Sequence, residues 1–408
     1  MKKIYTFLIL TIFALLLIGC GNVREDGVIN AAKHGVSEKN SGEENSKALQ
    51  ALIDKAALSG ATVYIPAGEY EFAENGKQKI GSHCIKMRSG VSIVGDGEKT
   101  VLKPVGSSYY GMDMFYFNDY IDKGEALYLE NCRFENFVID GSETSCRVYT
   151  SAGKGFMFNL FKNCHFKNVT VKNTDATGFG VDCPVESTIT GCTAIGCGKA
   201  ATQENSGASG FGIGFGYSEE ESIEISDCVA VGNKKFGFFF EHQGRFANLH
   251  RYSALPKEAF VIKNCRAEEN LYGFGGINTF KTFYEGCSSE NSLYYGFYFE
   301  NSFASGAEGC KSRGEGEACF AVAQGALPEI PEGMAGITFS SCEGENAPVG
   351  LLALCEGEEA PKAENCVFRG VAAEYEEREY DLNDLAESEE KEWLKNEAYI
   401  CSRAYRKR

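Results

Sequence analysis

Two acidic residues flank a glycine-rich segment in the middle of the chain and have the spacing of a paired-carboxylate site. Asp182 ends the segment GFGVD, Glu241 follows GFFF, and the segment GFGIGFG lies between them. If three such strands stack in register, the two carboxylates are two strand spacings apart, about 9 to 10 Å at the backbone. Inverting glycoside hydrolysis uses carboxyl pairs about 6.5 to 9.5 Å apart. The pattern predicts a carbohydrate-directed site with Glu241 as the acid and Asp182 as the base.

Strand alternation predicts the other outward residues of this site. If the aromatic residue after each glycine points into the core, the residues that face outward beside the two acids are Gly212, Gly214, Phe239, Tyr298 and Glu300. The two glycines have no side chain, so they predict a notch in which a sugar chain can lie. The two aromatic rings can stack on sugar rings.

Basic residues near the second acid predict how an anionic sugar would be held. Lys235 precedes the strand, His242 follows Glu241, and the insertion 243–259 contains Arg245 and Arg251. In an elimination reaction, His242 or a lysine would remove the proton next to the sugar carboxylate, and Arg245 would stabilise the enolate-like charge. Hydrolysis, elimination and epimerisation stay open, as does a non-catalytic glycan-binding or adhesin-like protein, because fold alone does not decide between them.

A repeat organises the strands that carry these residues. Segments such as AFVIKNCRAEENLYGFGGIN and KTFYEGCSSENSLYYGFYFEN share an alternating strand, a polar residue or glycine before a cysteine, a second strand, and a third strand after Gly-aromatic. Cys265, Cys287 and Cys310 are 22 and 23 residues apart. Repeats of this length, with 47 glycines, predict a solenoid. We expect an all-β, right-handed parallel β-helix over 45–372, an N-terminal capping helix, and a C-terminal helical cap over 373–408.

The N-terminal part resembles a known family. The segment NSKALQALIDKAALSGATVYIPAGEYEF (45–72) is similar to the start of pectate-lyase-superfamily (pectin lyase-like) domains, in which a helix caps the first coil. The resemblance is specific over 27–72, and it implies a parallel β-helix whose ligand is a polysaccharide. The acidic turn often found before that helix is replaced here by VSEKNSGEENS.

Family motifs further along the chain match only in part. Asn173-Thr174-Asp175, Asp182-Cys183 and GFGIGFG resemble the motif series of polygalacturonases, but Phe211 stands at the histidine position and no Arg-x-Lys follows. We therefore expect Asp175 to be a turn residue. The Asp-Pro-His motif of mannuronan epimerases and the clustered calcium-binding aspartates of pectate lyases are not found.

Composition limits the classes of partner. The formal net charge of −17 argues against binding to nucleic acid. The sequence has neither the paired CxxC motifs nor the histidine spacing of a zinc site. Its repeat cysteines each follow Asn, Gly, Asp or Ser and recur at irregular multiples of roughly one repeat, which indicates a stack of small buried thiols rather than disulfides. No metal site or cofactor is predicted, although calcium would allow an acidic protein to bind an anionic glycan. The protein is expected to act as a monomer.

The first twenty residues resemble a bacterial lipoprotein signal. MKKIYTFLILTIFALLLIGC has two lysines, an apolar stretch and a lipobox. The resemblance implies removal of 1–19, a lipid on Cys20, and a segment 20–44 that leads into the domain. It predicts an exported protein that is lipid-anchored to the bacterial membrane, at the cell surface or the periplasmic face.

Overall fold

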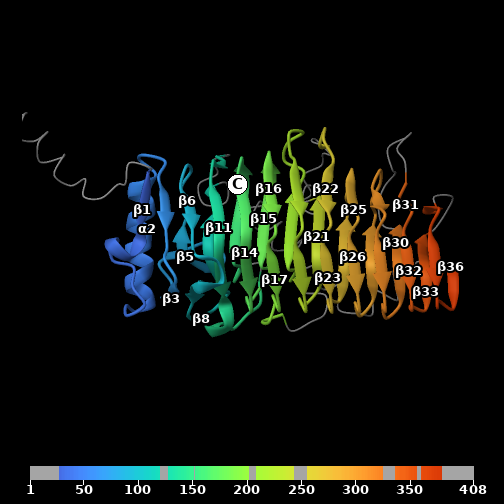
Figure 1. Ribbon diagram of the computed structural model, residues 1–408, viewed down its shortest axis with the longest axis horizontal. Helices are drawn as coiled ribbons and strands as arrows, with labels where there is room; N and C mark the ends of the chain where they lie inside the picture. The colour runs from blue at the N-terminus through green and yellow to red at the C-terminus, as the bar shows by residue number, and fades with distance from the viewer. Residues whose placement is uncertain are drawn as a thin grey trace, which may run out of the picture.

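The chain winds into an elongated stack of β-strands, with helix α2 at one end and strand β36 at the other (Figure 1). This computed structural model describes residues 27–119, 127–150, 152–201, 208–242, 255–324, 336–355 and 360–378. The expected signal segment, Cys20, Arg245 and Arg251 lie outside the described residues.

The strands form three walls that run the length of the stack. The first wall consists of β1 (Val28–Asn30), β2 (Thr62–Tyr64), β6 (Ser92–Val94), β11 (Arg133–Asp140), β14 (His165–Lys172), β16 (Ser187–Thr190), β19 (Ile223–Ser226), β22 (Phe260–Lys263), β25 (Thr282–Glu285), β28 (Gly306–Glu308), β31 (Thr338–Ser340) and β34 (Lys362–Glu364). The second wall consists of β3 (Gly68–Phe72), β7 (Thr100–Pro104), the later halves of β11 and β14, β17 (Thr193–Ile195), β20 (Val229–Val231), β23 (Arg266–Glu268), β26 (Ser288–Glu290), β29 (Lys311–Arg313), β32 (Glu343–Glu345) and β35 (Val367–Arg369). Because β11 and β14 run through both walls, the two walls form one hydrogen-bonded sheet.

The third wall is a separate sheet. It consists of β4 (Gly76–Lys77), β5 (Ser82–Lys86), β9 (Met112–Phe117), β13 (Phe156–Lys162), β15 (Phe179–Val185), β18 (Phe211–Phe215), β21 (Phe236–His242), β24 (Tyr272–Ile277), β27 (Tyr295–Glu300), β30 (Ala318–Gln324), β33 (Val349–Cys355) and β36 (Ala373–Arg378), with β10 (Leu129–Glu130) beside β13. Among the described strands only β4 and β5 pair antiparallel. The architecture is a parallel β-helix, as the repeat predicts.

The boundaries of the parallel β-helix differ from the predicted range 45–372 at both ends. The first coil begins with β1, which pairs with β2, so the stack starts before residue 45. At the other end, residues 373–378 form β36 and pair with β33, where a helical cap was expected to begin. The expectation was wrong for these six residues because they continue the alternating pattern of the third wall. Residues 379–408 lie outside the described part.

Helix α2 (Gly42–Ala56) contacts strands of the first coils at the N-terminal end of the stack. A capping box starts it: Glu44 N donates to Ser41 Oγ, and Ser41 N donates to Glu44 Oε2 at 2.8 Å. Its apolar face buries Leu49, Leu52 and Ile53 against the core. The other helical segments among the described residues are single 3₁₀ turns: η1 (Ala31–His34), η2 (Gly97–Lys99) and η3 (Gly141–Glu143). In the described residues no helix has the length and apolar character needed to cross a membrane.

A left-handed residue before the repeat cysteine makes the turn between the first and second walls in successive coils from β19 onward. Asp227, Asn264 and Gly286 have φ of 55°, 53° and 59°, and each precedes a buried cysteine. Only glycine and short polar residues adopt this conformation readily, which explains why these types recur at that position. The cysteines stack along the helix: Cys192 N lies 3.4 Å from Cys228 Sγ, and Cys228 N lies 3.4 Å from Cys265 Sγ. Every cysteine whose side chain is described is free and most are buried, which agrees with the predicted stack of thiols.

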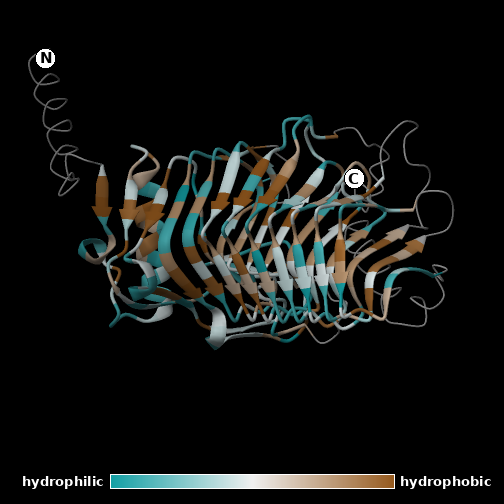
Figure 2. Cartoon of the chain, turned by 45° about the vertical axis from the view of Figure 1, so that its right-hand side comes forward, coloured by the Kyte–Doolittle hydropathy of each residue, from teal (hydrophilic) through white to brown (hydrophobic). Residues whose placement is uncertain are grey.

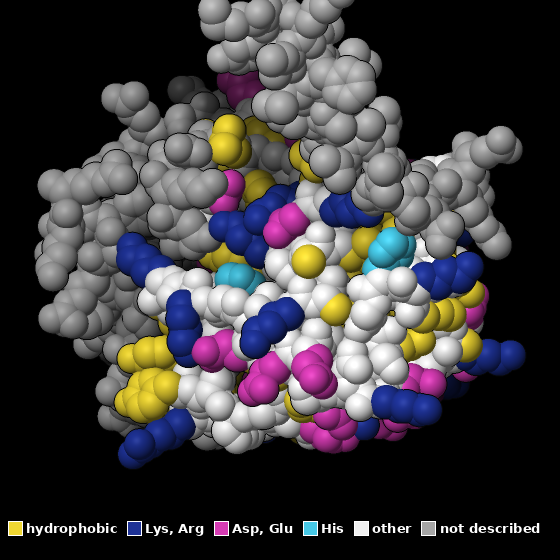
Figure 3. Space-filling model, turned by 90° about the vertical axis from the view of Figure 1, so that its left-hand side faces the viewer, with side chains coloured by type: hydrophobic (Ala, Val, Ile, Leu, Met, Phe, Trp, Pro, Cys, Tyr) yellow, Lys and Arg dark blue, Asp and Glu magenta, His cyan; other side chains and the backbone are white. Residues whose placement is uncertain are grey.

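A column of phenylalanines fills the core behind the third wall. Its rings stack along the axis with neighbouring centroids 4.7 to 5.4 Å apart, and its members are Phe115, Phe156, Phe179, Phe211, Phe238, Phe274, Phe297 and Phe320. Apolar and polar residues alternate along many strands (Figure 2). At the α2 end, basic and acidic side chains are interspersed over the described surface (Figure 3). The inward phenylalanines fix which residues of each third-wall strand face outward.

Candidate functional site

The two predicted carboxylates belong to one outward column of the third wall. Asn159 pairs with Asp182, Asp182 with Gly214, and Gly214 with Glu241. Asp182 and Glu241 are therefore two strands apart with a glycine between them, as predicted, and both are half-buried. Two strand spacings separate their backbones by about 9 to 10 Å. We call Asn159, Asp182, Gly214 and Glu241 the polar column.

The carboxylate of Asp182 is held by the neighbouring strand. Its Oδ1 accepts a hydrogen bond from Gly214 N at 2.9 Å. Cys183, the next residue, has φ of 57° and interrupts the regular pairing between β13 and β15. The carboxylate of Asp182 is thus held in place on the outer face as a hydrogen-bond acceptor.

The outward glycines do not form the empty notch that the sequence suggested. Gly214 is buried, and a Cβ on Gly212 would lie 3.2 Å from Thr177 Cγ2. A Cβ on Gly180, which pairs with Gly212, would lie 2.4 Å from Lys154 Cδ and 2.7 Å from Lys154 Nζ. The prediction was wrong because Lys154, which precedes β13, lies over Gly180 on β15, and Thr177, which precedes β15, lies against Gly212 on β18. The glycines make room for side chains of the chain itself.

Lys154 is a site residue that the sequence reasoning missed. It precedes β13, and its side chain crosses the outer face over Gly180 on β15, with Nζ 3.5 Å from Met157 Sδ. Gly180 stands two residues before Asp182 on the same face. The ammonium therefore lies beside the polar column. In the sequence, Lys154 is marked only as a lysine before Gly-Phe. Its contact with Gly180 joins residues 26 positions apart, and no local pattern predicts it.

A buried acid fixes the segment that carries Lys154. Asp113 on β9 is fully buried, and its Oδ1 accepts hydrogen bonds from Gly153 N at 2.8 Å and Lys154 N at 2.7 Å. Its Oδ2 accepts from Gln78 Nε2 at 2.7 Å. Burial raises the pKa of Asp113, while these hydrogen bonds act in the opposite direction. The backbone that precedes β13 is thus tied to the neighbouring strand.

Two predicted basic residues are buried. His242 is 1% exposed, and its ring packs edge-on against Phe215 at 5.2 Å, because strand alternation continues to the end of β21 and turns it inward. Lys235 is 2% exposed, with Nζ 5.4 Å from the centroid of the Phe236 ring. Neither side chain is placed to meet a sugar at the polar column.

Each of the predicted aromatic residues packs against neighbouring aromatic side chains. Tyr298 is 8% exposed and lies between Tyr272 and Tyr295, with ring centroids 5.5 and 5.3 Å away. Phe239 is half-buried and stacks on Phe236 at 4.6 Å. The hydroxyl of Tyr298 donates to Glu300 Oε2 at 2.9 Å. The ring faces of Tyr298 are therefore occupied by neighbouring side chains.

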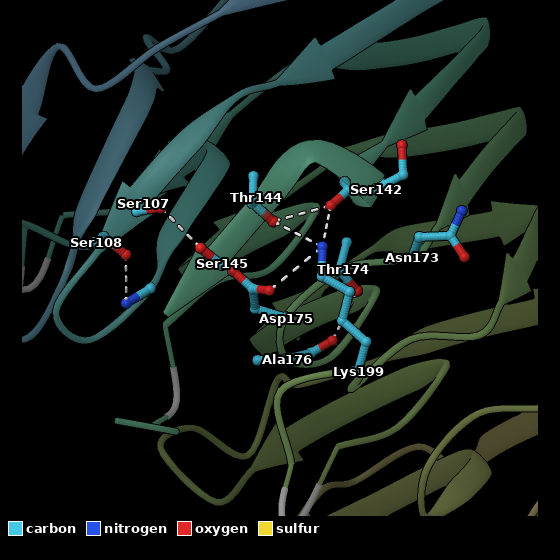
Figure 4. A network of polar contacts seen from close by, with 12 residues as sticks. Ser107, Ser108, Ser142, Thr144, Ser145, Asn173, Thr174, Asp175, Ala176 and Lys199 are labelled. Carbon is cyan, nitrogen blue, oxygen red and sulfur yellow. Dashed lines mark hydrogen bonds and ion pairs between the residues drawn. The ribbon is translucent and has the colours of Figure 1, made fainter. Parts of the chain in front are cut away.

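Asp175 lies at a different corner, between the second and third walls (Figure 4). It is 1% exposed, and Lys199 Nζ lies 3.4 Å from its Oδ1. The same ammonium donates to Gly141 O and to Thr144 Oγ1, the latter at 3.1 Å. Asp175 is thus a buried turn residue that anchors a lysine, as the sequence indicated. Among the described residues, no group of three or more His, Cys, Asp or Glu is arranged to hold a metal ion.

Comparison with known proteins gives both a family and structural relatives. Residues 28–298 match the family model described as rhamnogalacturonase A/epimerase, pectate lyase-like. Over 178 residues, or 41% of this chain, the sequence is 32% identical to mannuronan C5-epimerase AlgE1 of Azotobacter vinelandii and 33% identical to AlgE3. The matched regions span only 12% and 9% of those two relatives.

The structural relatives share the fold. The A-module of mannuronan C-5 epimerase AlgE4 from Azotobacter vinelandii has a TM-score of 0.51 and 17% identity, over 86% of this chain and 98% of that one. The tailspike protein of Escherichia coli bacteriophage HK620, solved in complex with a pentasaccharide, has a TM-score of 0.54 and 12% identity, over 87% of this chain and 65% of that one. Both matches extend over nearly the whole stack of coils.

Proposed function

Because the chain belongs to the pectate lyase-like family described as rhamnogalacturonase A/epimerase, we propose that it is an enzyme acting on a uronate-containing polysaccharide at the outer face of the third wall. The similarity to mannuronan C5-epimerases supports a uronate sugar, and the tailspike bound to a pentasaccharide supports a glycan ligand for this architecture. The reaction we propose is removal of the C5 proton next to the sugar carboxylate, followed by epimerisation or elimination.

The observation that carries this proposal is the Lys154 ammonium over Gly180, beside the polar column. Removal of a proton next to a carboxylate builds negative charge on that carboxylate. A cation held there stabilises the charge as it develops. Hydrolysis of a neutral sugar does not need such a cation. Lys154 thus takes the role that the sequence assigned to Arg245.

The two carboxylates supply the proton transfers. Asp182, whose carboxylate accepts the Gly214 N–H, acts as the base. Glu241, two strands along, acts as the acid that delivers a proton to the other side of the sugar or to the leaving oxygen. About 9 to 10 Å between the backbones leaves room for one sugar ring between the two side chains. In epimerisation the second proton returns to C5 from the opposite face and the glycosidic bond stays intact. In elimination the C4–O4 bond breaks, a C4=C5 double bond forms, and the second proton goes to the leaving oxygen.

The spacing of the same two carboxylates favours a second candidate, inverting hydrolysis. Incubation with mannuronan and with pectic polysaccharides in deuterated water separates the three reactions. Epimerisation places solvent deuterium at C5, elimination gives ultraviolet-absorbing unsaturated products, and hydrolysis gives new reducing ends without either signal. Asp182→Asn and Glu241→Gln should each abolish turnover in all three cases.

Lys154→Gln distinguishes proton abstraction from hydrolysis. We expect it to lower kcat/KM by about a hundredfold or more, the usual loss for one stabilising group at developing charge. Lys167→Gln is the matched control, because Lys167 is exposed on β14 of the same coil but on another wall. Full activity of Lys154→Gln together with new reducing ends would favour hydrolysis. Binding without turnover of any tested polysaccharide would make this a glycan-binding protein.

We also propose that the protein acts while anchored by a lipid on Cys20. Only the lipobox supports this, since Cys20 lies outside the described residues. Cys20→Ala should leave the chain unlipidated, and detergent partitioning together with the intact mass measures this. An unchanged lipidated product would contradict the anchor.

A further inference from the structure

A two-stranded ribbon stands apart from the three walls and presents aromatic rings to solvent. It consists of β8 (Gly106–Ser108) and β12 (Thr144–Cys146), which pair in parallel. The pairing continues beyond the strands, because Arg147 N donates to Ser108 O at 3.1 Å and Val148 N donates to Tyr109 O at 2.9 Å. The side chains of Tyr109 and Tyr110 are 53% and 41% exposed. The core does not use these rings.

An arginine lies on this aromatic surface. The Tyr109 and Tyr110 rings meet edge to face at 4.5 Å, and Arg147 Cζ lies 5.8 Å from the centroid of Tyr109. Arg147 forms no ion pair with any residue in the described part of the chain. The formal net charge is −17, so an exposed guanidinium without an acidic partner is notable here. A ring face binds the apolar face of a sugar, and a guanidinium binds a carboxylate in bidentate geometry.

Polar contacts hold the ribbon in place. Lys199 Nζ donates to Gly141 O and Thr144 Oγ1 at the start of β12, and Asp175 accompanies the ammonium at 3.4 Å (Figure 4). The hydroxyls of Ser107 and Ser145 are 2.8 Å apart across the ribbon. The anchor of the ribbon therefore comes from two later coils. A surface held in this way loses little conformational entropy on binding.

In the chain, each strand of the ribbon precedes a strand of the third wall. β8 leads into β9 and β12 leads into β13, so the ribbon lies at the N-terminal ends of both strands. Arg147 precedes Lys154 by seven positions. We infer that Tyr109, Tyr110 and Arg147 form a separate subsite, which binds further uronate residues of the polysaccharide whose reacting sugar lies at the polar column. This inference rests on the proposed function.

Binding of oligouronates of increasing length tests the subsite without any need for turnover. Calorimetric titration of the full chain with short and long oligomannuronates and oligogalacturonates should show tighter binding of the longer ones. Tyr109→Ala and Arg147→Gln should each weaken binding of long oligouronates by roughly fivefold to tenfold and leave short ones unchanged. Tyr109→Phe should retain affinity, because it keeps the ring. Added salt should reduce the difference in affinity for long oligouronates between the wild type and Arg147→Gln, because salt screens the charge of the guanidinium.

Tyr375→Ala and Arg266→Gln are the matched controls. Tyr375 is exposed on the terminal strand β36, many strands from the ribbon, and Arg266 is exposed on the second wall, so both variants should bind as the wild type does. If the ribbon variants bind long oligouronates as tightly as the wild type, while Asp182→Asn and Lys154→Gln abolish turnover, the subsite is wrong and the proposed function stands. If the ribbon variants weaken binding while Asp182→Asn and Lys154→Gln keep full turnover, the subsite stands and the assignment of the polar column is wrong. If the wild type binds no oligouronate of either kind, the subsite is overturned.

Discussion

Gly180→Ala is the most selective perturbation that the structure suggests, because it should displace one catalytic side chain without disturbing the core. A Cβ at this position would lie 2.4, 2.8 and 2.7 Å from Cδ, Cε and Nζ of Lys154. All three distances are too short for a real contact, so the lysine must leave. The atoms displaced are the far end of a flexible side chain, and the backbone of Gly180 is not in the left-handed region. An alanine therefore fits once the lysine has moved.

Gly180→Ala should have a small effect on stability and a large effect on activity. Replacing glycine by alanine where the backbone permits it stabilises a protein by about 0.4 to 1 kcal/mol, and loss of the lysine contacts offsets part of that gain. The free energy of unfolding should therefore change by less than about 1 kcal/mol. Activity should fall about a hundredfold, or about 2.7 kcal/mol in transition-state stabilisation, because the ammonium no longer lies beside the polar column.

Denaturant unfolding and turnover of the uronate polysaccharide measure the two effects. The control is Gly212→Ala, whose Cβ would meet Thr177 Cγ2 at 3.2 Å and would leave Lys154 in place. A double-mutant cycle sharpens the test, because Gly180→Ala should cost nothing further in a Lys154→Gln background. The reasoning is refuted if Gly180→Ala folds normally and keeps full activity. It is also refuted if the two substitutions are additive.

Three further predictions concern buried groups. Burial raises the pKa of Glu221 to about 7, so its contribution to the free energy of unfolding is present below about pH 4.5 and is lost as the pH rises through about 7. Glu221→Gln should remove this pH dependence of the free energy of unfolding, which amounts to up to about 3 kcal/mol. Urea unfolding at a series of pH values measures it, and a variant with the same pH profile as the wild type would contradict the prediction. Asp113→Ala leaves two backbone N–H groups without their acceptor and should lower the free energy of unfolding by about 2 to 5 kcal/mol, with Asp113→Asn lowering it less. If thermal unfolding finds both variants as stable as the wild type, these hydrogen bonds do not hold this segment. Cys228→Ala should lower the free energy of unfolding by about 1 kcal/mol, because it leaves a small cavity in the thiol stack. Thiol titration of the wild type in denaturant without reductant should find free cysteines, and mostly blocked thiols would mean disulfides instead.

The polar column shows how far the sequence reaches. Asp182, Gly214 and Glu241 are far apart in the chain, yet their register follows from aligning the Gly-aromatic segments, because each coil repeats the same inward phenylalanine. The same alternation predicts that His242 points inward, as the structure shows. His242 was nevertheless proposed as a site residue, because an imidazole can act as a base. Lys235 and Tyr298 were misplaced for a different reason. Strand periodicity sorts faces but does not show which neighbours cover an outward residue.

The sequence by itself determined the repeat, the three-walled coil and the thiol stack, since each follows from local rules: period two in strands, left-handed residues at turns, and small side chains at a crowded corner. Only the tertiary structure decided what occupies the outer face. Lys154 lies over Gly180, and Lys199 reaches Asp175 and Thr144 across neighbouring coils. These contacts join side chains from different coils, and their direction depends on the path of irregular segments between the strands. Periodicity carries no information about that path.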